Sequence, residues 1–269
     1  MLISIALPVA PALSTLHRES SQLDAIFWGF VASFSLPASA MLGAHYRPST
    51  KIVAGLLSFT AGVLIALLSY DLVGVSFATG GFAPSFLGMS IGLLTYFLAN
   101  RWLARIGCQF RRSCKHGGKA TANTGALALV LGALIDGIPE SASIGVGLME
   151  SPVVSIAMIT GVFIANIPEG LASGTGLNRA GLKHSQILTI WGLVTVACTL
   201  SSWLAFIFLR GSSAFVQATL ISTAGGGILA MTLQTVVPEA FDGTDDFISI
   251  LGCIGFCVVF TLSHLQGPH

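Results

Sequence analysis

Charged side chains are scarce in this chain. Of its 269 residues, 12 are Lys or Arg and 11 are Asp or Glu, so 9% carry a formal charge. A soluble globular domain carries about 25% charged residues, which cover its surface. Hydrophobic residues make up 54% of the chain, and the mean hydropathy is +0.85. This composition excludes a cytosolic enzyme and a nucleic-acid-binding protein, and it predicts a polytopic membrane protein with the lipid bilayer as a partner.

Cysteine is scarce as well, and its distribution excludes a disulfide framework. Of the five cysteines, three lie within apolar runs, where cysteine is usually a small buried hydrophobic residue: Cys198, Cys253 and Cys257. The other two, Cys108 and Cys114, flank a basic stretch. We interpret this stretch as a linker, with a weak metal-binding loop as the less favoured alternative.

Eight apolar stretches are candidates for membrane helices, which need about 20 mostly apolar residues each. They cover residues 25–44, 52–77, 84–100, 124–149, 153–177, 187–209, 214–237 and 247–265. The third stretch is short unless it begins near Phe82. The predicted fold class is therefore an all-α polytopic membrane protein, with residues 1–269 forming one transmembrane domain.

The basic residues predict the orientation of the chain in the membrane. With eight spans, ten of the 12 Lys and Arg residues fall on one side, in the connections after spans 1, 3 and 5. Only Arg18 and Arg210 fall on the other side. Lys and Arg accumulate in cytoplasmic loops, so we expect both termini outside and the connection after span 3 in the cytoplasm.

A first internal repeat relates the second and seventh spans. Residues 60–62 and 223–225 both read Thr-Ala-Gly and are followed by long apolar runs, which aligns Asp71 with Gln234. With eight spans these two helices cross the membrane in opposite directions. Such a relationship is typical of an inverted repeat of three helices on either side of a central pair, a 3+2+3 arrangement.

A second repeat relates the fourth and fifth spans. Residues 134–148 read LIDGIPESASIGVGL and residues 163–177 read FIANIPEGLASGTGL, which gives seven identities in 15 positions. Each segment has a proline followed directly by a glutamate, in the middle of an apolar run. A shared Pro-Glu pair inside two consecutive membrane spans indicates that the functional site lies here.

The repeated segments carry a set of oxygen ligands. Asp136 precedes Glu140 by four residues and Asn166 precedes Glu169 by three, so each pair lies on one face of its helix. Pro139 and Pro168 each free the carbonyl four residues earlier, although both are equally consistent with ordinary kinks. No Lys or Arg lies within either predicted span, and intramembrane acids are costly and usually functional.

This ligand set predicts a bound cation. A divalent ion, or protons on the acids, would compensate the negative charge, and oxygen ligands suit hard or borderline divalent metals. The metal ligands that we predict are Asp136, Glu140, Asn166 and Glu169. Three further polar residues are candidates for an entrance or pathway: Asp71, Gln234 and Glu239. A solvated helix end is the alternative for Asp71, and a solvated connection is the alternative for Glu239.

At these residues the chain resembles the ZIP family of divalent metal transporters. Members carry His-Asn-x-Pro-Glu in span 4 and a related pattern ending Pro-Glu-Gly in span 5; here the segments read Asp136-Gly137-Ile138-Pro139-Glu140 and Ala165-Asn166-Ile167-Pro168-Glu169-Gly170. The resemblance covers almost the whole chain. It departs from the family at Asp136, Gly137 and Ala165, and span 6 lacks the acidic ligand of several members. All six histidines lie in loops or near span ends.

The resemblance implies inward transport of a divalent transition-metal cation, with no enzymatic activity and no prosthetic group. Zinc favours nitrogen and sulfur ligands, so an all-oxygen site makes manganese and ferrous iron competitors of zinc. We expect the cell membrane of a bacterium as the location, with the metal ion as substrate, and a homodimer as an open alternative to a monomer.

Two other functions remain as alternatives. An intramembrane aspartyl protease would use Asp71 and Asp136, but the Gly-x-Gly-Asp motif of that class is missing, and these two aspartates lie two spans apart. The second alternative is a membrane sensor that binds a metal ion without transporting it.

Overall fold

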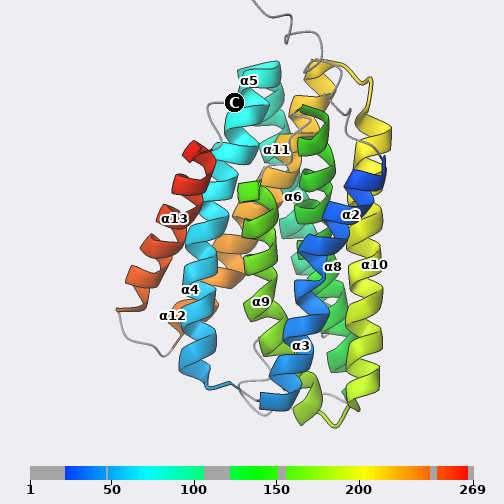
Figure 1. The fold of residues 1–269 in the computed structure, drawn as a ribbon, viewed down its shortest axis with the longest axis vertical. Coiled ribbons are helices and arrows are strands. Elements are labelled where there is room, and N and C mark those ends of the chain that lie inside the picture. The colour runs from blue at the N-terminus through cyan, green and yellow to red at the C-terminus, as the bar shows by residue number, and fades with distance from the viewer. Residues whose placement is uncertain (1–21, 47, 106–121, 151–155, 243–246, 266–269) are drawn as a thin grey trace, which may run out of the picture.

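The computed structural model describes residues 22–46, 48–105, 122–150, 156–242 and 247–265. Within these ranges the secondary structure is helical and contains no strand. The elements form a bundle of long helices that run along one axis (Figure 1). Six helical segments are long and apolar enough to cross a membrane: Gln22–Tyr46, Thr50–Gly80, Phe82–Trp102, Ile156–Arg179, His184–Leu209 and Ala214–Phe241. The chain is thus an all-α protein of the multi-pass membrane type.

Helices occupy the first three and the last two of the predicted stretches, and three of these five stretches are divided into shorter helical segments. The first is α2 (Gln22–Ser33) and α3 (Ser35–Tyr46), and the second is α4 (Thr50–Leu67), η1 (Leu68–Gly74) and α5 (Val75–Gly80). The third is α6 (Phe82–Arg105), which begins at the residue that the length argument required. The seventh is α11 (Ala214–Met231), η2 (Thr232–Val236) and α12 (Val237–Phe241), and the eighth is the shorter α13 (Ile248–Leu265).

The middle of the chain forms three uninterrupted helices, α8 (Ala122–Glu150), α9 (Ile156–Arg179) and α10 (His184–Leu209). Pro139 lies inside α8 and Pro168 inside α9, and both helices continue through them. A helix therefore occupies each of the eight predicted stretches. The number that cross a membrane stays a prediction for α8 and for the short α13.

The helices pack in four pairs: α6 with α11, α4 with α13, α3 with α9, and α8 with α10. In each pair at least one glycine allows direct backbone contact, because an added Cβ would overlap a carbonyl oxygen of the partner helix. These glycine–carbonyl contacts are Gly92 with Thr223, Gly62 with Gly252, Gly174 with Ala40, and Gly145 with Ser202.

Helices α4 and α11 have the same construction. Each has 18 residues, and each begins after a serine, Ser49 or Ser213, whose hydroxyl accepts a hydrogen bond from the backbone N–H three residues later at 3.4 Å. Each passes directly into a π-helical segment, η1 or η2. The aligned residues Asp71 and Gln234 both lie in these segments. The short Thr-Ala-Gly match therefore marks two helices that are alike in length, start and irregular end.

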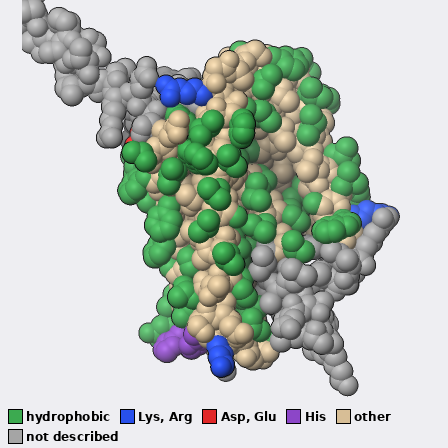
Figure 2. Space-filling model, turned by 90° about the vertical axis from the view of Figure 1, so that its right-hand side faces the viewer, with side chains coloured by type: hydrophobic (Ala, Val, Ile, Leu, Met, Phe, Trp, Pro, Cys, Tyr) green, Lys and Arg blue, Asp and Glu red, His purple; other side chains and the backbone are tan. Residues whose placement is uncertain are grey.

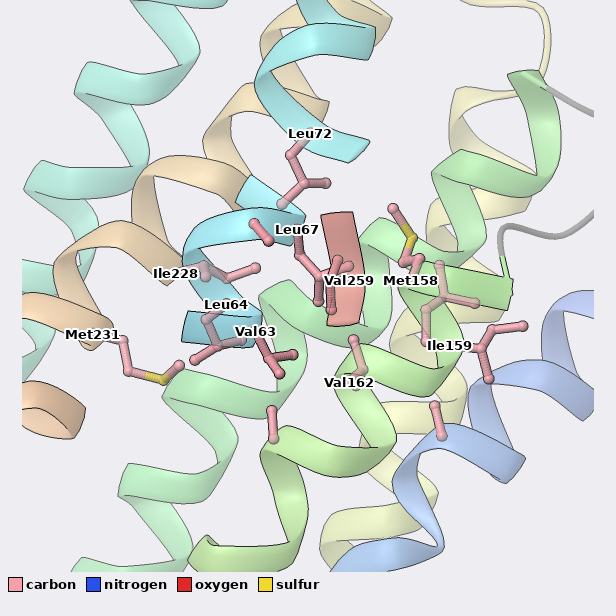
Figure 3. Packing of buried hydrophobic residues seen from close by; sticks show 14 of the residues in the cluster. Val63, Leu64, Leu67, Leu72, Met158, Ile159, Val162, Ile228, Met231 and Val259 are labelled. Atoms are coloured by element: carbon pink, nitrogen blue, oxygen red, sulfur yellow. The ribbon is translucent and has the colours of Figure 1, made fainter. Parts of the chain in front are cut away.

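The centre of the bundle is apolar. Side chains from α4 and α11, among them Leu64, Leu67 and Ile228, face Met158, Val162 and other residues of α9 (Figure 3). All of them are at most 6% exposed. This packing joins the pairs α4/α13 and α6/α11 to the helices α8 and α9, which carry the predicted metal ligands.

Exposed basic residues gather at one end of the bundle. Lys51 is in the first turn of α4, Arg101 is in the last turn of α6, and Arg179 and Lys183 lie where α9 ends and α10 begins. The start of α4, the end of α9 and the start of α10 lie at the bottom of Figure 1, whereas α10 ends, next to Arg210, at the top. The described part of the chain thus has most of its positive charge at the end that the sequence assigns to the cytoplasm.

Candidate functional site

The site is built around two buried polar residues on neighbouring helices. Glu140 of α8 is 2% exposed and Asn166 of α9 is 3% exposed. Glu169 follows one turn after Asn166 and is half-buried. The prolines before both glutamates lie inside their helices, so the carboxylates project from continuous helical faces.

Cys198 of α10 brings the two glutamates into one environment. Its thiol forms side-chain hydrogen bonds with Ser141 and Ser33, and it interacts electrostatically with both Glu140 and Glu169. Cys198 is 1% exposed. It packs against α8 so closely that a Cβ on Gly137 would lie 2.8 Å from its sulfur. Cys198 therefore lies against α8, where the charges of both predicted glutamate ligands act on its thiol.

Serine hydroxyls line the space between α2 and α8. The Ser33 and Ser141 hydroxyls lie 3.4 Å apart, and both side chains are almost fully buried, at 0% and 1% exposed. Helix α2 thus contributes to the site together with α8, α9 and α10. Four different helical segments converge here, which is typical of a binding site inside a helical bundle.

Asn166 is held by the break in the first span. Helices α2 and α3 are separated at Phe34, and Pro37 has no N–H to donate to Ser33. The carbonyls exposed by this break are bound by side chains of neighbouring helices. The Asn166 Nδ2 donates to the Ala32 carbonyl at 3.2 Å, and the Thr195 hydroxyl donates to the Ser33 carbonyl at 3.4 Å. Because its amide nitrogen is engaged, the Asn166 carboxamide has a fixed orientation.

Asp71 is buried and does not lie at a solvated helix end. It is 4% exposed, and its Oδ2 accepts a hydrogen bond from the Ser263 hydroxyl of α13 at 3.1 Å. Burial inside η1 disagrees with the alternative of a solvated helix end. π-Helical turns are rare and often occur at functional positions. The location of Asp71 in η1 is therefore consistent with a functional position, but it does not identify the function.

Gln234 and Glu239 lie near the end of the seventh span. The exposed Gln234 accepts a hydrogen bond from Asn100 Nδ2 of α6 at 3.1 Å. The next residue, Thr235, lies 3.1 Å from the Tyr96 hydroxyl of the same helix. Glu239 is half-buried in α12. Polar side-chain contacts therefore join η2 to α6, just as the contact between Asp71 and Ser263 joins η1 to α13.

The fourth predicted ligand, Asp136, lies on the backbone of α8, but its side chain is outside the described part of the structure. Among the residues that are described, no three His, Cys, Asp or Glu side chains approach closely enough to hold a metal ion. The predicted ligands Glu140, Asn166 and Glu169 thus do not form a closed coordination shell in the described part of the structure.

Two features of the site were not predicted from the sequence. Cys198 was interpreted as a small hydrophobic residue, and its polar neighbours come from other helices, so no local pattern could reveal them. The break in the first span had a local signal in Ser33, Ser35, Pro37 and Ser39, which place a proline among hydroxyl groups inside an apolar stretch.

Comparison with known proteins adds no assignment, because no family model and no curated protein matches this chain.

Proposed function

We propose that this chain transports a divalent transition-metal cation, zinc, ferrous iron or manganese, across the cell membrane into the cytoplasm, as the resemblance to the ZIP family implies. The observation that carries the proposal is the pair of glutamates on α8 and α9, buried Glu140 and half-buried Glu169, whose charges both act on the buried Cys198 thiol. Two glutamates, each following a proline in consecutive spans, would provide charged ligands in the interior of the bundle. Buried acids in a membrane are expensive and usually functional.

The proposed donor set is mixed. Carboxylate oxygens of Glu140 and Glu169, the Asn166 carboxamide oxygen and Asp136 would bind a borderline metal, and the Cys198 thiolate would add a sulfur ligand. Sulfur favours zinc over manganese. The substrate that we propose first is therefore zinc, and this changes the preference that an all-oxygen site gave.

The proposed architecture is eight spans in a 3+2+3 inverted repeat. In such a repeat, span 1 is equivalent to span 6, span 2 to span 7, span 3 to span 8, and span 4 to span 5. When each span is replaced by its equivalent, every one of the four helix pairs becomes another of the four. The pair α4/α13 becomes α11/α6, and α3/α9 becomes α10/α8. The matched construction of α4 and α11 supports the same exchange. Inverted repeats of this kind are common in secondary transporters, with the substrate site near the middle of the membrane.

In the proposed orientation both termini lie outside and the basic end of the bundle faces the cytoplasm. The positions of Lys51, Arg179 and Lys183 at one end support it, since cytoplasmic loops are rich in Lys and Arg. A cation would enter from the end that holds η1 and Asp71. It would leave toward the end that holds η2 and Glu239.

The test is metal flux into proteoliposomes with a panel of zinc, ferrous iron and manganese. We expect zinc uptake by the wild type and a loss of at least tenfold in Glu140→Ala and in Glu169→Ala. Asp24→Asn, an acid near the start of α2, is the matched control and keeps wild-type uptake. Wild-type flux in both glutamate variants would refute the site, and metal binding without flux would identify a sensor.

A further inference from the structure

We infer that His45 and His184 form a second metal site, at the basic end of the bundle and separate from the intramembrane carboxylates. The two imidazole rings have centroids 6.2 Å apart and planes tilted by 54°. They come from positions 139 residues apart, in the last turn of α3 and at the first residue of α10. The site would take a borderline divalent cation such as Zn²⁺, Ni²⁺ or Cu²⁺.

The separation of the rings suits two ligands of one ion. Imidazole nitrogens bind Zn²⁺ at about 2.0–2.1 Å, which places the centroids of two bound rings about 5 Å apart at a tetrahedral angle and about 6.4 Å apart on opposite sides of the ion. At the observed 6.2 Å the two rings would lie almost on opposite sides of one ion, and a side-chain rotation that brings them about 1 Å closer gives the tetrahedral arrangement. Both side chains are exposed, so an ion reaches them from solvent and water can complete its coordination.

The backbone under both rings is fixed by specific contacts. The last turn of α3 is tied to α9, because Thr175 Oγ1 donates to the Gly43 carbonyl at 2.9 Å and Asn178 donates to the Ala44 carbonyl. The start of α10 is fixed by the Lys183 backbone N–H, which donates to the Gln186 side chain at 2.9 Å. Binding therefore requires only side-chain rotation, and little ordering of the chain.

The charges around the pair have opposing effects. Lys183 precedes His184, Arg179 ends α9, and Lys51 lies in the first turn of α4. These cations oppose a bound metal, but their exposed side chains are long enough to turn toward water. The carbonyl end of α3 under His45 carries partial negative charge and favours a cation. Figure 2 shows the histidine patch at the lower end of the bundle, open to solvent beside a basic side chain.

The experiment is histidine footprinting with diethyl pyrocarbonate, read by site-resolved mass spectrometry with Zn²⁺ as the probe. We expect Zn²⁺ to slow modification of His45 and His184 at least fivefold. His264, an exposed histidine on α13, is the internal control and is modified at the same rate with and without Zn²⁺. In His184→Ala, and equally in His184→Gln, the protection of His45 disappears because the ion loses one of its two ligands.

Two outcomes would overturn the inference: no protection of either residue, or equal protection of His45 in wild type and in both His184 variants. The same measurement in Glu140→Ala separates this site from the proposed transport site. We expect full protection of His45 and His184 in that variant whether or not it transports zinc. Size-exclusion profiles identify any variant that fails to fold, and the His184→Gln change keeps the polarity of the helix start.

Discussion

Asp71 and Ser263 join the second span to the last helix of the chain. The Ser263 hydroxyl donates to Asp71 Oδ2 at 3.1 Å, and both side chains are buried. The bond crosses from the π-helical η1 to α13, between residues 192 positions apart. A buried polar contact of this kind stabilises the fold, and it leaves the charge of Asp71 as a separate property that can be tested.

We predict that Ser263→Ala lowers the free energy of unfolding by about 1–3 kcal/mol, because it removes a donor from a buried carboxyl group. Thermal unfolding in detergent measures the effect. Thr261→Ala is the control, since the exposed Thr261 hydroxyl donates only within α13, to Cys257. Equal melting temperatures for the Ser263 and Thr261 variants would contradict a stabilising role for the contact.

Asp71→Asn separates the bond from the charge. An asparagine oxygen still accepts from Ser263, so we expect a nearly unchanged melting temperature. If Asp71 attracts the cation at the outer end of the bundle, zinc uptake falls severalfold in the same variant. Wild-type uptake with wild-type stability would show that Asp71 has no part in the pathway.

Cys198 should set the preference for soft metals. We predict that Cys198→Ser transports manganese as well as the wild type, while its selectivity for zinc or cadmium over manganese falls roughly tenfold, because oxygen replaces sulfur in the donor set. Absorption spectra with Co²⁺ provide an independent measurement, since thiolate-to-cobalt charge transfer disappears in the variant. Cys253→Ser, an exposed cysteine on α13, keeps both the selectivity and the spectrum. A wild-type spectrum in Cys198→Ser would exclude sulfur coordination at this site.

Gly145 and Gly132 give a matched pair on α8. A Cβ at Gly145 would overlap the Ser202 carbonyl oxygen of α10, whereas a Cβ at Gly132 meets nothing within 4 Å. We predict that Gly145→Ala destabilises the protein by about 1–3 kcal/mol, the cost of overpacking a close contact. Gly132→Ala should be neutral or stabilising, because alanine favours a helix by about 1 kcal/mol over glycine. Thermal unfolding of the two variants compares them directly, and equal destabilisation would refute the close contact between α8 and α10.

The span positions were predictable because they depend on local composition. Apolar stretches of about 20 residues suffice to locate membrane helices, and a helix occupies each predicted stretch within a few residues of its expected bounds. The third stretch was predicted at 84–100, and α6 begins at Phe82, where the length of a membrane span favours its start. The close packing at Gly145 and Gly174 agrees with the tendency of small residues to lie between membrane helices.

The environment of Cys198 could not be predicted in the same way. Its neighbours Ser33, Ser141, Glu140 and Glu169 come from three other helices, and which faces meet is decided by tertiary packing. The π-helical segments η1 and η2 could not be predicted from local sequence either. The alignment of Asp71 with Gln234 identified equivalent positions, but it contained no signal that the helices widen there.

Asn166 is predicted to have two separable roles. Asn166→Asp keeps an oxygen ligand but loses the donor to the Ala32 carbonyl, which is bound at 3.2 Å in the wild type. The Ala32 carbonyl still accepts a hydrogen bond from the Ser35 hydroxyl at 2.8 Å. We therefore expect a slightly lower melting temperature with retained zinc binding, because the net contribution of one hydrogen bond, about 0.5–1.5 kcal/mol, is lost. Asn166→Ala should lose stability and affinity together. Titration calorimetry and thermal unfolding measure the two properties, and unchanged stability in both variants would show that the break in the first span does not depend on Asn166.

The orientation of the chain can be tested with single cysteines at the two ends of the bundle. Lys51→Cys and Lys183→Cys place a thiol at the basic end, and Arg210→Cys places one at the opposite end. All three positions are exposed. In intact cells a membrane-impermeant maleimide should label Arg210→Cys and leave the other two unlabelled, because Lys and Arg concentrate on the cytoplasmic side. After permeabilisation all three variants should react equally, which controls for reactivity. Labelling of Lys51→Cys and Lys183→Cys from outside, with protection of Arg210→Cys, would reverse the orientation. It would then place the proposed entrance at the end that holds η2 and Glu239.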